Sequence, residues 1–230
     1  MLVYAISDQH GLLPEIEEAH DLLLIGGDIC PVDDHTVEYQ RDWLDTEFRA
    51  WLEQIPAKRI VGVAGNHDMV FDIAATYRPI FEPLRPPGIK PPDDLPWTYL
   101  QDQSVIINGY KIHGTPWQPI FFNWAFNLDE EHLAEKFQLI DDDVNILISH
   151  GPPQGYGDLT SQGVRVGSSS LLAKIKEVKP ELVVCGHIHE AHGSYDLAEQ
   201  QTKIVNATIV DLAYQNVYLP TRLELPDRNA

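Results

Sequence analysis

Five short, largely apolar runs divide this chain, and each of them ends in polar residues. The runs cover Val3–Ser7, Asp21–Ile25, Ile60–Ala64, Val144–Ile148 and Leu182–Cys185. Runs of this length and composition are typical of strands buried on both faces of a parallel sheet. Helical patterns lie between them, and a repeated β-α-β order favours an α/β fold. Because the carboxyl ends of parallel strands meet at one edge, we expect a ligand site there.

The polar residues at these run ends are of the kinds that bind metal ions. They are Asp8 and His10, Asp28, Asn66 and His67, His150, and finally His187 and His189. In an extended segment, side chains two residues apart point to the same side, so each i, i+2 pair can serve one metal centre. Taken singly, an aspartate after a strand is often a helix cap, and a histidine there is often a surface residue. Their joint occurrence favours a shared site.

The number and chemistry of these donors indicate two metal ions. Seven ligands, which are these residues without His67, exceed a single tetrahedral site but match two metals that share one bridging carboxylate. Imidazole, carboxylate and amide donors suit manganese, iron, zinc or nickel without any thiolate. Two such ions roughly 3.5–4 Å apart can hold the attacking and leaving oxygens of a phosphoryl group. We therefore expect two divalent ions and a small phosphate ester as substrate. The donors leave these four metals open, and manganese is the one we favour.

Composition narrows the partners and the setting. A formal charge of −19 repels polyanions, so we expect no broad nucleic-acid binding, and metal ions would supply the positive charge that a small ester needs. No apolar run approaches the ~20 residues of a membrane helix, and the N-terminus lacks the basic flank of a signal peptide. Only two cysteines are present, Cys30 and Cys185, so we expect no disulfide scaffold and a cytoplasmic location. The length suits one domain over residues 1–230, and the sequence does not determine the oligomeric state.

The remaining segments predict covering helices and further strands. Apolar positions at i, i+3/i+4 spacing predict a helix from about Thr36 to Ile55. Further helices are expected at 12–20, 129–140 and from 168–170 to 178, with further strands at 97–101, 104–107, 110–113, 193–196, 203–206 and 214–223. Asn108-Gly109 is typical of a type I′ hairpin turn, which favours sheets of mixed character. Pro79–Pro96 holds seven of the seventeen prolines and is interpreted as an ordered surface excursion.

The five polar blocks resemble the five-block signature of the calcineurin-like metallophosphoesterases. The blocks are Asp8-x-His10, Gly27-Asp28, Gly65-Asn66-His67-Asp68, His150 and Gly186-His187-x-His189. Further segments resemble the small metallophosphoesterase-domain-containing proteins, including the mammalian brain members: Gly65–Asp72, Tyr99–Asp102, Gly114–Trp117, Phe126–Leu128, His150–Pro153 and Asn206-Ala207. This resemblance implies a four-layer α/β/β/α sandwich with mixed sheets and a dimetal site above the sheet edges.

The resemblance also implies a role for each block. One metal would be held by Asp8, His10, Asp28 and His189, and the other by Asp28, Asn66, His150 and His187, with Asp28 bridging. His67 would donate a proton or hydrogen bond to the leaving oxygen, and a metal-bridging hydroxide would attack phosphorus.

Two comparisons within the family bear on substrate and activity. Protein-phosphatase members extend the second block with an aspartate and an arginine, whereas Gly27-Asp28 runs into Ile29-Cys30-Pro31-Val32 here. A phosphoprotein substrate is therefore disfavoured, and the motif supplies no partner to orient His67. Some brain members lack the first histidine of the last block, but His187 is present here. The ligand set is therefore complete, and we expect an active enzyme.

We therefore expect a phosphodiesterase acting on cyclic-nucleotide or nucleotide-like esters. The alternatives are a phosphomonoesterase with the same site and a non-catalytic, metal-bound binding module.

Four residues beside the blocks are candidate substrate contacts. They are Arg165, His113, Trp117 and Phe121. An arginine can clamp a phosphate, and aromatic faces can stack on a base. The alternatives are a solvated loop arginine, a structural histidine and aromatic residues that pack a loop. The other four histidines, at positions 20, 35, 132 and 192, are assigned to the surface.

Overall fold

The first of two sheets follows from the first three apolar runs. The computed structural model describes residues 1–72, 88–197 and 201–228. The sheet has the order β13-β1-β2-β3-β4. Its strands are β1 (Leu2–Ile6), β2 (His20–Ile25), β3 (Ala57–Gly62), β4 (Thr98–Tyr99) and β13 (Thr221–Glu224). The pairs β1–β2, β2–β3 and β3–β4 are parallel, and β13 adds to β1 antiparallel.

The second sheet is also mixed and has the order β11-β12-β10-β9-β6-β5. Its strands are β5 (Gln103–Ile107), β6 (Tyr110–Thr115), β9 (Ile146–Ser149), β10 (Leu182–Cys185), β11 (Gly193–Leu197) and β12 (Thr202–Asn206). Strands β6, β9, β10 and β12 run parallel, and the edge strands β5 and β11 are antiparallel to their neighbours. Asn108 and Gly109 have φ of 51° and 77°, as the predicted type I′ turn between β5 and β6 requires. A separate pair is formed by β7 (Gln118–Pro119) and β8 (Asn127–Leu128).

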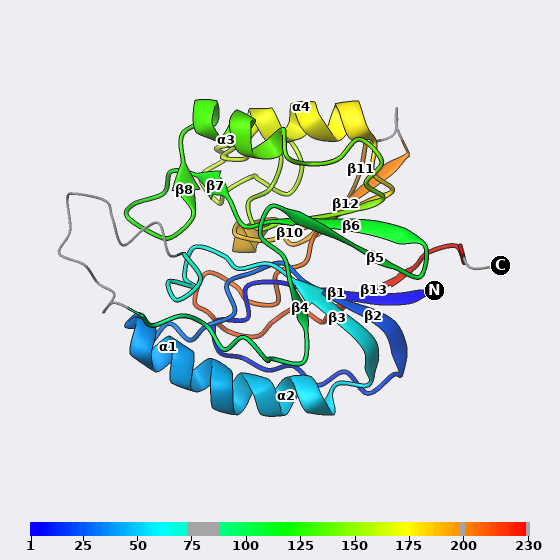
Figure 1. The fold of residues 1–230 in the computed structure, drawn as a ribbon. Helices are drawn as coiled ribbons and strands as arrows, with labels where there is room; N and C mark the ends of the chain where they lie inside the picture. The colour runs from blue at the N-terminus through cyan, green and yellow to red at the C-terminus, as the bar shows by residue number, and fades with distance from the viewer. Residues whose placement is uncertain (73–87, 198–200, 229–230) are drawn as a thin grey trace.

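In the described part of the chain, three helical segments cover the outer faces of the two sheets. Below the first sheet lies one helical run, made of α1 (Val37–Trp43), a π-helical turn (Leu44–Phe48) and α2 (Arg49–Gln54). Above the second sheet lie α3 (Glu130–Phe137) and α4 (Ser169–Val178), whose N-caps are Asp129 and Ser168. Figure 1 shows the resulting four layers. The expected α/β/β/α sandwich is confirmed.

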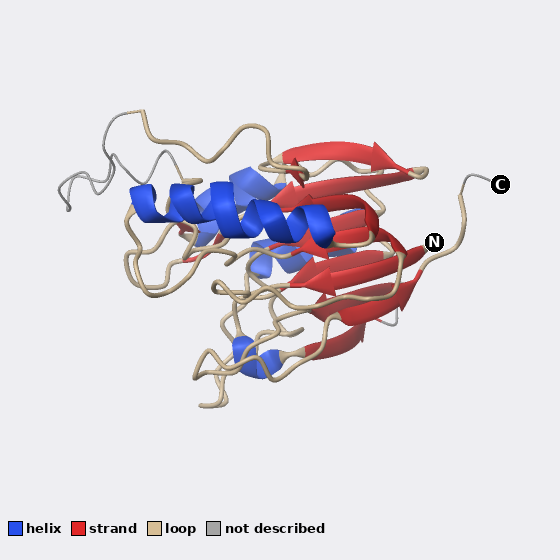
Figure 2. Ribbon diagram, turned by 90° about the horizontal axis from the view of Figure 1, so that it is seen from below, coloured by secondary structure: helices blue, strands red, loops and turns tan. Residues whose placement is uncertain are grey.

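Apolar side chains alternate between an inner layer and two outer layers. Leu22 and Leu24 of β2 pack between the sheets, whereas Leu23 and Ile25 face the helices. Each fully buried leucine or isoleucine side chain contributes about 1.5–3 kcal/mol relative to leaving it exposed. Because both faces of the central strands are buried, their carboxyl ends are held rigidly. Figure 2 shows the loops gathered at the end of the sheets away from the N-terminus.

Two predicted elements are wrong. Residues 12–20 form no helix before β2 begins. Their apolar side chains pack on the core from irregular chain, namely Leu12, Leu13 and Ile16. The Pro14 carbonyl accepts a hydrogen bond from Trp51 Nε1. The strand expected at 214–223 begins only at Thr221, and Tyr214 lies in a turn. Of the expected proline-rich excursion, 79–87 lies outside the described residues and 88–96 has neither helix nor strand.

Within the described ranges, no helix is long and apolar enough to span a membrane.

Candidate metal centre

The predicted donors all follow strands whose carboxyl ends meet at one edge. Asp8 and His10 come after β1, Asp28 after β2, and Asn66 with His67 after β3. From the second sheet, His150 follows β9, and His187 and His189 follow β10. The first sheet therefore supplies both carboxylates and the amide, and the second supplies imidazoles.

The backbone at four of these donors is left-handed rather than extended. The φ angles are 55° at Asp8, 45° at His10, 54° at Asp28 and 68° at His187. The expectation that the i, i+2 pairs lie on extended backbone is thus wrong, although each pair converges. A left-handed non-glycine residue costs roughly 1–2 kcal/mol. The fold carries this strain at the positions that aim the donors inward.

Two glycines of the motifs are required by close approach. A Cβ on Gly65 would overlap the Asp28 carboxylate and the His150 ring. A Cβ on Gly186 would overlap Ser7 Oγ and the Asp8 carboxylate. The motif glycines therefore allow donors from different strands to approach one another closely.

The donor atoms of the described residues form overlapping clusters: one joins His10, Asp28 and His67, and two adjoining clusters exclude His67. The ligand atoms of Asp8, His10 and His189 lie within 4.8 Å of one another, as do those of Asp28, His150 and His187. The Asp28 carboxylate reaches both clusters, with Oδ2 3.7 Å from His10 Nε2 and Oδ1 3.5 Å from His150 Nε2.

Asn66 adds an amide to the second cluster, with its Oδ1 2.9 Å from His150 Nε2. Buried histidines and aspartates so arranged fit a dimetal site.

The outer hydrogen bonds orient the imidazoles as ligands. His150 Nδ1 lies 2.9 Å from the Gly26 carbonyl, and His189 Nδ1 lies 3.1 Å from the Asp211 carbonyl. Since a carbonyl only accepts, both Nδ1 atoms carry a proton. The Nε2 lone pair of neutral His150 therefore faces the centre, whereas Nε2 of His189 lies 3.4 Å from Asp8 Oδ1, its ion-pair partner. Metal-binding histidines are commonly held in this way.

Burial governs the charges of the centre. It lowers the pKa of His10 and His150, and it lowers the pKa of His187 to about 3, helped by the His150 charge. Burial and the charges of Asp8 and Asp68 raise the pKa of Asp28 well above its usual range.

Asp8 and His189 form the opposite case. Burial disfavours the charged form of each residue. The hydrogen bond and charge of His189 nevertheless lower the pKa of Asp8, and those of Asp8 raise the pKa of His189. The centre thus combines one ion pair with neutral imidazoles that have free lone pairs.

Comparison with known proteins places this arrangement in a family. A family model described as calcineurin-like phosphoesterase matches residues 1–191, which include every predicted ligand. The chain belongs to this family. Metallophosphoesterase domain-containing protein 1 of Homo sapiens is 35% identical over 96% of this chain and 70% of its own length, and the Mus musculus protein matches equally.

Among solved structures, phosphopantetheinyl hydrolase from Mycobacterium tuberculosis aligns with a TM-score of 0.51. The match covers 90% of this chain and 88% of that chain at 14% identity, and it shows a shared fold. The predicted resemblance is confirmed.

Asp68, the last residue of the third block of this metallophosphoesterase, braces the centre from outside. Its carboxylate accepts hydrogen bonds from the backbone N–H groups of Ile29, Cys30 and Gly65 at 2.8–3.1 Å. These groups flank Asp28 and Asn66. Asp68 therefore ties the loop after β2 to the loop after β3.

His67 has neighbours that the motifs do not contain. Its Nδ1 lies 3.0 Å from Nε2 of His35, and its ring stacks on Trp124 with centroids 4.2 Å apart. The assignment of His35 to the surface is therefore wrong. The position of His35, seven residues after Asp28, was the available signal, because so short a connection keeps it near the centre.

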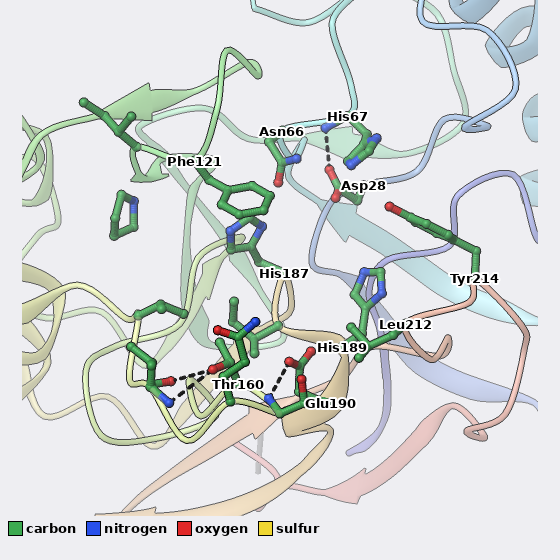
Figure 3. Close-up of a pocket in the computed structure, with 17 residues that line it drawn as sticks. Asp28, Asn66, His67, Phe121, Thr160, His187, His189, Glu190, Leu212 and Tyr214 are labelled. Carbon is green, nitrogen blue, oxygen red and sulfur yellow. Dashed lines mark hydrogen bonds between the residues drawn. The ribbon is translucent and has the colours of Figure 1, made fainter.

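A cavity of about 610 Å³ opens beside the donors (Figure 3). Apolar and aromatic side chains border much of it, including Ile120, Phe121, Val164, Leu212 and Tyr214. Among the lining residues that the structure describes, none is lysine or arginine, and Glu190 is present. Leu212 and Tyr214 lie beyond residue 191, where the family match ends.

The predicted substrate contacts are distributed unevenly around this cavity. Phe121 lines it, with half of its surface exposed. Arg165 lies outside the lining and bonds the buried Asp158 at 2.6 Å. Trp117 is buried and donates to Asp102, and His113 is buried beside Ser104. Trp117 and His113 thus make structural contacts, whereas Arg165 is ion-paired, and substrate contact by these three residues stays a prediction.

Two of the remaining histidines also differ from the surface assignment. His20 is buried, so its assignment to the surface is wrong, and His192 is half-buried against Tyr218. His132 is exposed, as expected.

Proposed function

We propose that this chain is a dinuclear-metal phosphodiesterase that hydrolyses small phosphodiesters, with cyclic-nucleotide or nucleotide-like esters favoured. The observation that carries the proposal is the convergence of seven donors beside a cavity whose described lining has no lysine or arginine. Membership of the phosphoesterase family supports the reaction class.

Each donor has a proposed place. Asp8, His10, Asp28 and His189 would hold one divalent ion, and Asp28, Asn66, His150 and His187 the other. When bound, these ions would supply positive charge and an activated water at neutral pH. Manganese is the favoured metal, and elemental analysis after loading with manganese, iron, zinc or nickel tests that preference.

The chain's own residues would orient the ester and assist its leaving group. His67 is buried at the cavity wall, and its Nδ1 is taken by His35. Its Nε2 is therefore the nitrogen available to hydrogen-bond the leaving oxygen. Phe121 offers an exposed ring on which a base could stack.

Charge favours a diester over a monoester. A phosphate monoester carries about −1.5 to −2 near neutral pH, whereas a diester carries a single negative charge. The described cavity lining, which includes Glu190 and neither lysine nor arginine, favours the less charged ester. A phosphomonoesterase with the same centre is the second candidate, because the centre itself can act on either ester.

The test compares turnover of bis-p-nitrophenyl phosphate and p-nitrophenyl phosphate by manganese-loaded protein. We expect faster diester turnover, and Asp28→Ala prepared in parallel controls for contaminating phosphatases. Faster monoester turnover would reverse the substrate preference. Two bound metals with no turnover of either ester would instead identify a binding module.

A further inference from the structure

We infer that His35 is a positioning residue that fixes the orientation and tautomer of His67. The inference rests on the proposed function for its catalytic meaning. Its physical basis is the 3.0 Å contact between His35 Nε2 and His67 Nδ1, which joins the loop before α1 to the loop after β3.

The His67 ring is held on several sides. Trp124 stacks on it at 4.2 Å, and the edge-to-face contact with His10 has centroids 4.8 Å apart. The backbone of His67 is also fixed, since its N–H donates to Asp28 Oδ1 at 2.7 Å and its carbonyl accepts from Gln40 Nε2 at 2.6 Å. Packing thus limits the tilt of the ring, and the contact with His35 distinguishes its two nitrogens.

The type of partner and, for a histidine, its tautomer decide which nitrogen of His67 carries the proton. A carboxylate partner would accept from Nδ1–H and leave Nε2 of a neutral ring without a proton. A neutral histidine can either donate Nε2–H to Nδ1 of His67 or accept from it, and we infer the first arrangement, in which His35 donates. The neutral His67 ring then carries its proton on Nε2 and can donate to a substrate oxygen without first becoming charged.

His35 is itself anchored in a way that suits this task. Asp34 Oδ1 accepts from the Thr36 backbone N–H at 2.8 Å, immediately before α1 begins at Val37. The ring of His35 also packs against Trp124, with centroids 4.9 Å apart. One indole therefore contacts both histidines and keeps their nitrogens facing.

Three variants separate hydrogen bonding from packing. His35→Phe keeps a ring against Trp124 but removes the nitrogen. His35→Gln places an amide near the former Nε2 position and keeps a possible donor. His132→Ala removes an exposed histidine as the matched control. All are assayed with aryl diesters that differ in leaving group, from p-nitrophenol to the poorer leaving group phenol.

A positioning role predicts a loss that depends on the leaving group. Losing one orienting hydrogen bond of about 1–1.5 kcal/mol corresponds to about tenfold in kcat. We expect this loss in His35→Phe with the phenol ester, a smaller loss with the p-nitrophenol ester, recovery in His35→Gln, and unchanged metal content. Equal losses across the series, or none, would overturn the inference, as would a parallel loss of metal. His132→Ala should match the wild type throughout.

A measurement independent of turnover keeps the two proposals apart. Long-range ¹H–¹⁵N NMR of the zinc-loaded protein reports the tautomer of His67. We expect a single Nε2–H tautomer in the wild type and a mixture in His35→Phe. The same tautomer in both would refute the positioning role, whereas an inactive wild type with the expected NMR change would refute only the proposed function.

Discussion

Six of the seven proposed metal ligands are buried, whereas Ile120, Phe121, Val164 and Leu212 of the adjoining cavity wall are each at least half exposed. Four of the ligands sit on strained backbone at the ends of buried strands, and the wall residues lie in loops. The centre is therefore organised before any substrate arrives, while the wall side chains are left for substrate to cover. Changes at the centre should alter metal content, turnover or stability, and changes at the wall should alter substrate affinity.

The largest expected effect is that of Asp28→Ala. Because Asp28 reaches both donor clusters, its loss should lower bound metal at both positions and reduce turnover to background. Elemental analysis and diester turnover measure this directly. Wild-type metal content in the variant would show that Asp28 does not bridge.

His67→Ala should separate turnover from metal binding within the centre. We expect turnover to fall roughly 10²–10⁴-fold, the usual contribution of a positioned acid or hydrogen-bond donor, with metal content near wild type. A matching loss of metal would make His67 a ligand instead.

Asp68→Ala should destabilise the centre by removing the carboxylate that joins the loops after β2 and β3. The change leaves three buried backbone N–H groups without their acceptor, at about 1–3 kcal/mol each. We expect the free energy of unfolding, measured in urea, to fall by several kcal/mol. Asp33→Ala in the exposed part of the same loop is the control and should be neutral. An equally stable Asp68→Ala protein would contradict the bracing role.

Acid should destabilise the metal-free centre. The lowered pKa values of His10, His67, His150 and His187 mean that the unfolded chain takes up protons below about pH 6.5 while the folded rings stay neutral. The free energy of unfolding should therefore fall as the pH is lowered below about 6.5, offset in part by the raised pKa values of Asp28 and His189. Urea unfolding of chelator-treated protein at pH 7 and pH 5.5 tests this, and equal stability at both would contradict it.

The smallest expected effect is that of Phe121→Ala at the wall. Loss of one apolar contact of about 1.4 kcal/mol should raise KM for an aryl diester about tenfold and leave kcat nearly unchanged. Phe122→Ala is the matched control, because Phe122 is more exposed and does not line the cavity. A fall in kcat without a change in KM would contradict the expectation that wall residues affect substrate affinity rather than turnover.

Sequence patterns could predict the sandwich and the convergence of the donors because both depend on contiguous residues. The run Leu182–Cys185 fixes a buried strand, and Gly186 to His189 must then lie at its end. Prediction failed where the decisive contact joins distant loops without a repeating pattern. His35 meets His67 across 32 residues, and Trp124 reaches both from the second half of the chain. The turn at Tyr214 depends likewise on Asp211, whose Oδ1 accepts from the Ala213 and Gln215 backbone N–H groups.

The left-handed backbone at four ligands determines which substitutions would relieve strain if the metal centre were no longer needed. At roughly 1–2 kcal/mol for each residue, the strain is a sizeable part of the about 5–15 kcal/mol that stabilises a typical domain. Glycine adopts the same backbone without strain. A lineage released from selection for hydrolysis would therefore be favoured to place glycine at positions 8, 10, 28 or 187. Such a descendant would keep the sandwich, lose the centre and tolerate destabilising changes elsewhere.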